Sequence, residues 1–115
     1  MIQVENVTRV FKTGEADVHA LRGVTFNVRS GDFVAITGRS GSGKSTLMYQ
    51  MSALDFPTHG VVEIDGVDIT KLSHQERTEL RLNSLGYVFQ DYALLPELTA
   101  SENVMVPLLM PVSYT

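Results

Sequence analysis

The sequence predicts an α/β fold, and three features carry this prediction. A short apolar run, Phe33–Thr37, leads into a glycine-rich segment and then into Lys44–Met51, which has no glycine or proline and is typical of a helix. Apolar and polar residues alternate near the N-terminus, as in half-buried strands. Asp65-Gly66 lies within an apolar stretch and is a strong hairpin signal. We therefore expect early antiparallel strands and one buried strand that enters a helix.

The elements before that helix are predicted from alternation and turn residues. Apolar residues between 2 and 10 indicate a first strand, and residues 13–17 indicate a turn. The chain then continues into residues 18–21, and the alternation of Val24, Phe26 and Val28 with polar residues up to Arg29 predicts a half-buried strand. Ser30-Gly31-Asp32 is the turn that delivers Phe33 to the third strand.

The second half of the chain is expected to hold a hairpin, two helices and one more strand. Residues 55–60 indicate a loop, and the hairpin lies within 61–69. Ser73 with Glu76, and Thr99 with Glu102, have the spacing of capping boxes. They predict a polar helix to about Asn83 and a short helix through Val106 that Pro107 stops. Residues 85–90 are predicted to form the further strand.

The glycine-rich segment fits the phosphate-loop pattern G-x-x-x-x-G-K-[ST] without a mismatch. Its residues are Gly38, Arg39, Ser40, Gly41, Ser42, Gly43, Lys44 and Ser45, followed by Thr46. The glycines permit close backbone approach to an anion, and the lysine supplies a charge for the β- and γ-phosphates. Ser45 offers a hydroxyl to Mg²⁺, and Thr46 can donate to the α-phosphate. A glycine-serine linker is the alternative, but a linker needs neither the lysine nor the preceding strand.

Length and charge narrow the functional classes. The 115 residues suit one small domain, and the formal charge of −4 with scattered basic residues disfavours nucleic-acid binding. The chain has no cysteine, which excludes disulfides and thiolate metal sites. Its N-terminus does not resemble a signal peptide, and its longest apolar stretch, residues 104–112, is too short to span a bilayer. We expect a cytoplasmic location.

Several separated motifs resemble those in the front half of an ABC-transporter nucleotide-binding domain. They are Gly31–Gly38 leading into Walker A, Pro57-Thr58-His59-Gly60 as the P-T-x-G turn, and Tyr87-Val88-Phe89-Gln90 as the strand that ends in the Q-loop glutamine. Shorter segments resemble the lipoprotein-release and macrolide-export branch, namely residues 55–58, 64–66, 88–90, 94–96 and 98–104. The resemblance implies a phosphate-loop NTPase half-domain over residues 1–115, with an antiparallel β-subdomain and the start of the parallel-sheet core.

The resemblance also implies roles for residues outside the phosphate loop. Phe11 falls where an aromatic ring stacks on adenine, and packing in the core is its alternative. Gln90 falls where an amide oxygen reaches Mg²⁺ and the attacking water, and a solvated strand-end glutamine is its alternative. Asp91–Leu98 would face a transmembrane subunit of a transporter, unless the domain's own core buries it. Lys44 and Gln90 are thus the candidate catalytic positions, with ATP and Mg²⁺ as cofactors.

The sequence contains no L-S-G-G-Q signature, no Walker B acid with its catalytic glutamate and no switch histidine after Val104. The expected function is therefore that of an ATP-binding fragment of an ABC transporter, which binds Mg-ATP without appreciable turnover. In the intact protein it would power export or lipoprotein release beside a second nucleotide-binding domain, on the cytoplasmic face of the membrane. The alternatives are a non-hydrolytic regulatory module and a soluble, non-transport ABC ATPase. The transported substrate is not encoded in these residues.

Overall fold

The computed structural model of the chain describes residues 1–91 and 93–109, and it comprises two compact units. The first unit is Met1–Ser73 and the second is His74–Thr115. Phe11 and the phosphate loop belong to the first unit, whereas Gln90 belongs to the second.

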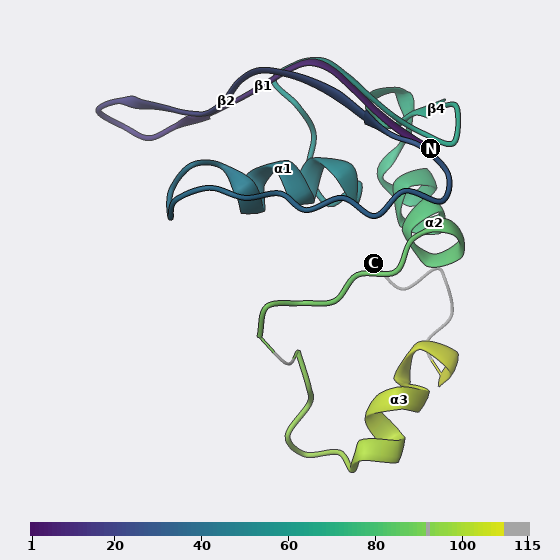
Figure 1. Cartoon of the computed structure of the whole chain (residues 1–115). Coiled ribbons are helices and arrows are strands. Elements are labelled where there is room, and N and C mark those ends of the chain that lie inside the picture. Colours follow the sequence, from purple (N-terminus) through teal and green to yellow (C-terminus); the bar gives the residue numbers. More distant parts are fainter. Residues whose placement is uncertain (92, 110–115) are drawn as a thin grey trace. The chain divides into compact units, whose positions relative to one another are not determined.

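The first unit is built on a four-stranded antiparallel sheet with the strand order β2-β1-β3-β4. Its strands are β1 (Ile2–Lys12), β2 (Asp17–Val28), β3 (His59–Ile64) and β4 (Val67–Asp68). Figure 1 shows the long hairpin of β1 and β2 extending beyond the other strands. The predicted antiparallel strands are confirmed.

Helix α1 (Lys44–Met51) lies against β1, β2 and β3, as predicted for the segment after the phosphate loop. The core between sheet and helix consists of buried aliphatic side chains. They are Val4, Val7, Leu21, Leu47, Ala53, Val62, Ile64 and Ile69. Alternate residues of β1 and β2 face this core because side chains point to opposite faces along a strand. The buried face of the sheet therefore packs against α1.

Three bulges interrupt the pairing of the long strands. The register leaves Asn6 as an extra residue in β1, and Gly23 and Ala20 as extra residues in β2. Asn6 has a positive φ of 48°, and its backbone N–H donates to Thr25 Oγ1 at 2.9 Å. A bulge increases local twist and redirects the strand that contains it. The bulge at Ala20 matters for function because Ala20 lies against the phosphate loop.

Two predicted turns are also confirmed. Asp65 and Gly66 have φ values of 49° and 81° and connect β3 to β4, as a two-residue hairpin turn requires. The backbone N–H of Thr13 donates to the Ala16 carbonyl at 3.2 Å and closes the turn between β1 and β2. After β4 the chain forms a short 3₁₀-helix, η1 (Ile69–Lys71), which Asp68 caps through the Thr70 N–H.

The second unit contains α2 (His74–Ser84) and α3 (Ala100–Leu109). The predicted capping box is formed at α3, where the Thr99 N–H donates to Glu102 Oε1 at 2.9 Å and the Glu102 N–H donates to Thr99 Oγ1 at 3.1 Å. The Thr99 N–H and then the Thr99 side chain, both hydrogen-bonded to the Glu102 carboxyl, lower the pKa of that carboxyl. Asn103 fastens the preceding loop, since it accepts from the Leu95 N–H and donates to the Leu95 carbonyl. Within the described residues, no helix is both long and apolar enough to cross a membrane.

Three predictions about elements are wrong. Pro107 does not stop α3, which continues to Leu109; proline removes only one helical N–H, the one that would reach the Asn103 carbonyl. Residues 33–37 and 85–90 are not strands, because neither segment has a pairing partner in the described part of the chain. Phe33 and Val88 are accordingly 99% and 96% exposed, although an apolar run normally predicts burial.

Gly60 yields a test of the packing between β1 and β3. Its φ is 95°, and an added Cβ would meet the Glu5 carbonyl oxygen at 2.6 Å and the Asn6 carbonyl still closer. We expect Gly60→Ala to lower the free energy of unfolding by about 2–4 kcal/mol, from left-handed strain and overpacking together. Urea denaturation followed by circular dichroism measures this change.

The matched control is Gly14→Ala, because Gly14 has no positive φ recorded and a Cβ there meets no atom within 4 Å. This variant should stay within about 0.5 kcal/mol of the unchanged protein. Equal stability of both variants would contradict the close approach of β3 to the Asn6 bulge.

Candidate functional site

The phosphate-loop residues form a closed turn around the Lys44 side chain. Its ammonium donates to the Gly38 carbonyl at 2.6 Å and to the Arg39 carbonyl at 2.8 Å. The Ser42 N–H donates to the same Arg39 carbonyl at 3.1 Å. The loop therefore encloses a positive charge whose present partners are neutral oxygens, and anionic oxygens would be stronger acceptors.

Two glycines of the loop lie in tight places: a side chain at Gly38 would require the Ser42 hydroxyl to move, and Gly43 lies against backbone. A Cβ on Gly38 would come within 2.6 Å of Ser42 Oγ, inside the loop. A Cβ on Gly43 would come within 2.5 Å of the Ala20 carbonyl oxygen in β2, and Gly43 has a φ of 99°. The motif glycines are thus needed for two different contacts, one within the loop and one against the sheet.

Helix α1 begins directly after Gly43, which serves as its N-cap without a side-chain hydrogen bond. Ser45 and Thr46 lie in the first turn, where backbone N–H groups lack helical acceptors and the helix dipole is positive. The first turn holds no acidic residue that would compete with an anion. Loop glycines, an enclosed ammonium and a free helix terminus together suit the phosphates of a nucleotide.

Phe11 lies near this loop along the sheet. It pairs with Val18 of β2, two residues before Ala20, which corresponds to about 7 Å along the strand. Phe11 is 38% exposed, so it is not packed in the core. The ring is therefore accessible at the surface, and its stacking on adenine remains a prediction.

The structure adds a cluster that sequence reasoning missed. The Arg9 guanidinium lies 4.2 Å from the centroid of the Phe11 ring, and its Nε donates to Asp55 Oδ2 at 2.7 Å. Gln50 of α1 donates to the same carboxylate oxygen at 3.0 Å. The i, i+2 spacing of Arg9 and Phe11 places both on one face of a strand and could have indicated their contact. No local pattern links Arg9 to Asp55, which is 46 residues away.

Asp55 is charged in this cluster. Burial raises the pKa of its carboxyl, but the hydrogen bonds from Arg9 and from the Phe56 N–H, with the Arg9 charge and the Gln50 amide, lower it below the ordinary value of 3.8. Because the pKa of this carboxyl is lower in the folded than in the unfolded state, the ionised group stabilises the folded unit at pH values above the ordinary pKa. That contribution is lost as the pH falls through the lowered pKa.

The remaining predicted residues lie in the second unit. Gln90 is exposed and follows a coil segment in which the rings of Tyr87 and Phe89 are 4.7 Å apart. Leu94 and Leu95 are 62% and 46% exposed, so the segment 91–98 does not bury them in a core. The roles of Gln90 and of this segment remain predictions.

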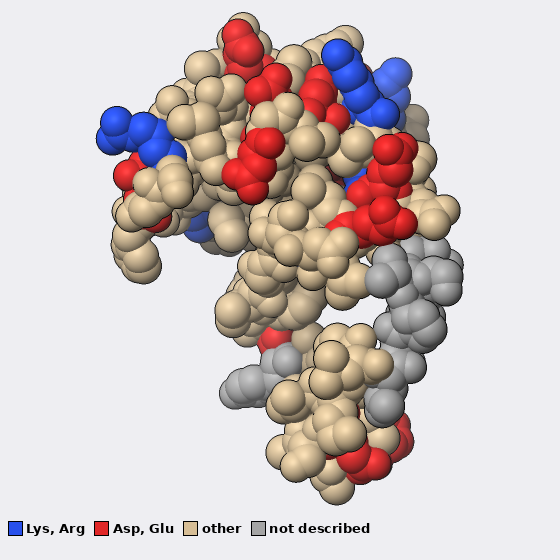
Figure 2. Space-filling model, turned by 90° about the vertical axis from the view of Figure 1, so that its right-hand side faces the viewer, with Lys and Arg blue, Asp and Glu red and all other residues tan. Residues whose placement is uncertain are grey.

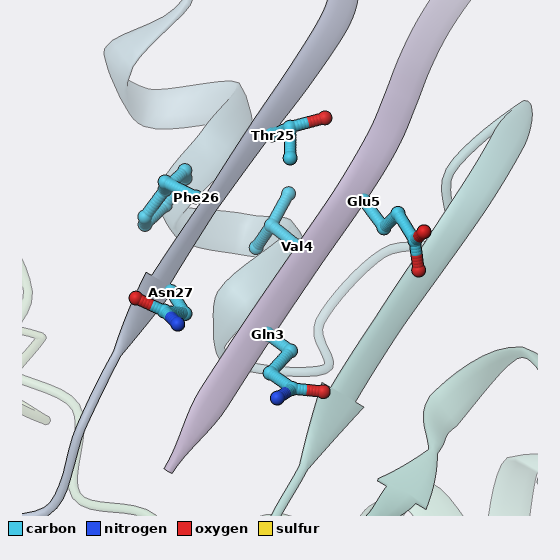
Figure 3. A pocket seen from close by; sticks show the side chains of 6 residues that line it. All are labelled: Gln3, Val4, Glu5, Thr25, Phe26 and Asn27. Carbon is cyan, nitrogen blue, oxygen red and sulfur yellow. The ribbon is translucent and has the colours of Figure 1, made fainter.

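A pocket of the sheet away from the phosphate loop has a lining that does not suit an anion. A pocket at the end of β1 and β2 that lies beside β3 is lined by Gln3, Val4, Glu5, Thr25, Phe26 and Asn27 (Figure 3). Its one charged lining residue is a carboxylate, which repels phosphate. On the face shown in Figure 2, the described Lys and Arg side chains do not merge into one continuous patch.

Comparisons with known proteins agree with this geometry. The sequence profile described as ABC transporter matches residues 21–114. The chain is 46% identical over 109 residues to the uncharacterized ABC transporter ATP-binding protein MJ0796 of Methanocaldococcus jannaschii, with 95% of this chain and 46% of that protein covered. It is 45% identical over 108 residues to the macrolide export ATP-binding/permease protein MacB of Syntrophobacter fumaroxidans, with 94% of this chain and 15% of that protein covered.

A solved structure is similar as well. The dimeric, post-hydrolysis structure of MJ0796 bound to ADP and Pi matches with a TM-score of 0.89 and 45% identity, covering 95% of this chain and 47% of that one. The chain thus spans less than half the length of these relatives. Because the family profile matches most of the chain and the phosphate loop has the required geometry, the protein belongs to the ABC transporter family.

Proposed function

We propose that this chain is the front part of the ATP-binding domain of an ABC transporter and that it binds Mg-ATP through residues 38–46. The observation that carries the proposal is the loop that holds the Lys44 ammonium on two of its own carbonyls, with Gly43 in a backbone contact that excludes a side chain. The ATP-binding relatives, and the ADP and Pi bound in the MJ0796 structure, support it.

The loop residues fit the parts of the nucleotide by their chemistry. Lys44 would exchange its two carbonyl acceptors for oxygens of the β- and γ-phosphates, because charged acceptors bind an ammonium more strongly. Ser45 would contribute its hydroxyl to Mg²⁺, and Thr46 would donate to the α-phosphate. A bound Mg²⁺ supplies charge neutralisation between the phosphates. Phe11 would stack on the base.

The second unit would serve the intact transporter. Gln90 would help position Mg²⁺ and water, and the exposed Leu94 and Leu95 in the segment 91–98 would contact a transmembrane subunit. A second nucleotide-binding domain would complete the site at the cytoplasmic face of the membrane. A non-hydrolytic regulatory module, bound to a partner by the same exposed leucines, is the alternative. ATP-dependent export by the assembled transporter would exclude it.

The first test concerns Lys44. We expect Lys44→Ala to weaken Mg-ATP binding by roughly 1.5–3 kcal/mol, because a charge-assisted hydrogen bond to phosphate is lost. Isothermal titration calorimetry on the purified chain measures this change.

The matched control is Lys71→Ala, which removes the same charge from the exposed end of η1. It should bind Mg-ATP like the unchanged chain. Ser45→Ala should weaken binding chiefly when Mg²⁺ is present. Equal ATP affinity of Lys44→Ala and the unchanged chain would overturn the proposal.

The second test concerns the base. Phe11 offers a stacking face without a hydrogen-bonding edge, so the site should distinguish purines poorly. ATP and GTP should compete within roughly tenfold, or about 1.4 kcal/mol. A hundredfold preference in a competition titration would show that another residue recognises the base.

The third test concerns turnover. The 115 residues contain the phosphate loop but no Walker B acid or signature loop, so the chain on its own should hydrolyse ATP at a background rate. General-base catalysis alone is worth about 10²–10⁴-fold, and charge stabilisation is often larger. Phosphate release from the highly purified chain measures turnover, with Lys44→Ala as the contamination control. A rate of about 1 s⁻¹ that this substitution abolishes would contradict the expectation.

A further inference from the structure

We infer that Arg9 is a positioning residue that holds the Phe11 ring for stacking on the nucleotide base and ties this ring to the helix that follows the phosphate loop. The inference rests on the proposed function and deepens it. It adds a specific determinant of base affinity to a site otherwise defined by phosphate contacts.

The Arg9 guanidinium is fixed from two sides. Its Nε and Nη2 donate to Oδ2 and Oδ1 of Asp55 at 2.7 and 3.3 Å, so the carboxylate holds the plane of the guanidinium at two points. Its Cζ lies 4.2 Å from the centroid of Phe11. The Arg9 and Asp55 side chains are 24% and 29% exposed, so this pair is partly shielded from solvent.

Asp55 is in turn held by helix α1. Gln50 is fully buried in that helix, and its Nε2 donates to Asp55 Oδ2 at 3.0 Å. Its Oε1 is buried without a hydrogen-bond partner among the described residues, an arrangement that costs free energy. The amide is thus directed at Asp55 in spite of that cost. One end of α1 contacts the phosphates in the proposed function, and the other end fixes Arg9.

The segment from Asp55 to Thr58, which carries the Asp55 carboxylate, is hydrogen-bonded to β1 beside Arg9. The Thr58 N–H donates to the Thr8 carbonyl at 2.7 Å, and the Val10 N–H donates to Thr58 Oγ1 at 2.9 Å. Asp55 is therefore held close to β1 even without its ion pair. For this reason the loop should remain in place when Arg9 is replaced.

The contact between Arg9 and Phe11 would increase the affinity for the base because it orders the ring before the base binds. A phenylalanine that is 38% exposed on a strand would lose rotamer freedom when a base stacks on it. The guanidinium already covers one face of the ring and restricts its rotamers, which leaves the opposite face for the base. Preorganisation of this kind increases affinity because less ordering is left for the binding step.

The experiment compares ATP with inorganic tripolyphosphate, which has the phosphates but no base. Both are titrated with Mg²⁺ into the unchanged chain, Arg9→Met and Arg29→Met. Arg29 is the matched control because it also pairs with an aspartate, Asp32, at 3.6 Å, and lies at the opposite end of β2 from Val18. We expect Arg9→Met to reduce ATP affinity roughly three- to tenfold, with tripolyphosphate affinity changed less than about twofold.

Two further variants separate positioning from a structural role. In a Phe11→Leu background, Arg9→Met should cause no additional loss of ATP affinity, because no ring is left to position. Asp55→Asn should also lower ATP affinity, as Arg9→Met does, because the guanidinium loses its charged partner. Arg9→Lys keeps the charge without the planar fork and should lose less than Arg9→Met.

Unchanged ATP affinity in Arg9→Met would overturn the inference. An equal loss of affinity for ATP and for tripolyphosphate would also overturn it, because such a loss would indicate a general structural effect. If Arg9→Met does not fold, unchanged ATP-to-tripolyphosphate ratios in both Arg9→Lys and Asp55→Asn would overturn it. Failure of the proposed function has a different signature. The unchanged chain would then bind neither ligand, or Lys44→Ala would bind both equally well, and the inference would fall with it.

Discussion

Gly43 lies against the backbone of β2: a Cβ on this residue would be 2.5 Å from the carbonyl oxygen of Ala20. This contact constrains the position of the phosphate loop relative to the sheet. Ala20 is the extra residue of a bulge in β2, so its carbonyl lies outside the regular ladder. Leu21, the next residue, is buried in the core and keeps the bulge in place. The phosphate loop, the Ala20 bulge and the buried Leu21 are therefore directly connected. The residue before α1 must be a glycine, because a side chain there would collide with the Ala20 carbonyl.

A second bulge in the same sheet supports the part of the proposed site around Arg9 and Phe11. The bulge at Asn6 brings the start of β3 so close that only glycine fits at position 60. The residues just before it, from Asp55 to Thr58, then hydrogen-bond to Arg9 and Val10 at the far end of β1. In the proposed function, the strand pair β1 and β2 thus aligns the phosphate loop with the Phe11 ring.

How much the sequence predicts depends on the range of the interactions involved. The phosphate loop, α1, the Asp65-Gly66 turn and the capping box at Thr99 are local, so their residue types and spacing predicted them. The segments at Phe33 and Val88 were predicted as strands from composition, but a strand needs a partner, and composition does not supply one. The contact of Arg9 with Asp55 could not be predicted because the separation of 46 residues is closed only by the complete sheet.

The segment at residues 33–37 has a consequence for work in solution. Phe33 is 99% exposed and Val34 is 49% exposed, on a backbone without a ladder partner among the described residues. Backbone amide groups without a partner, beside exposed apolar side chains, can pair with the same segment of a second copy, as the unpaired groups of an edge strand do. Because this segment leads directly into Gly38, self-association would distort the loop that binds the ligand. Dilution of the protein should therefore increase its apparent affinity for nucleotide.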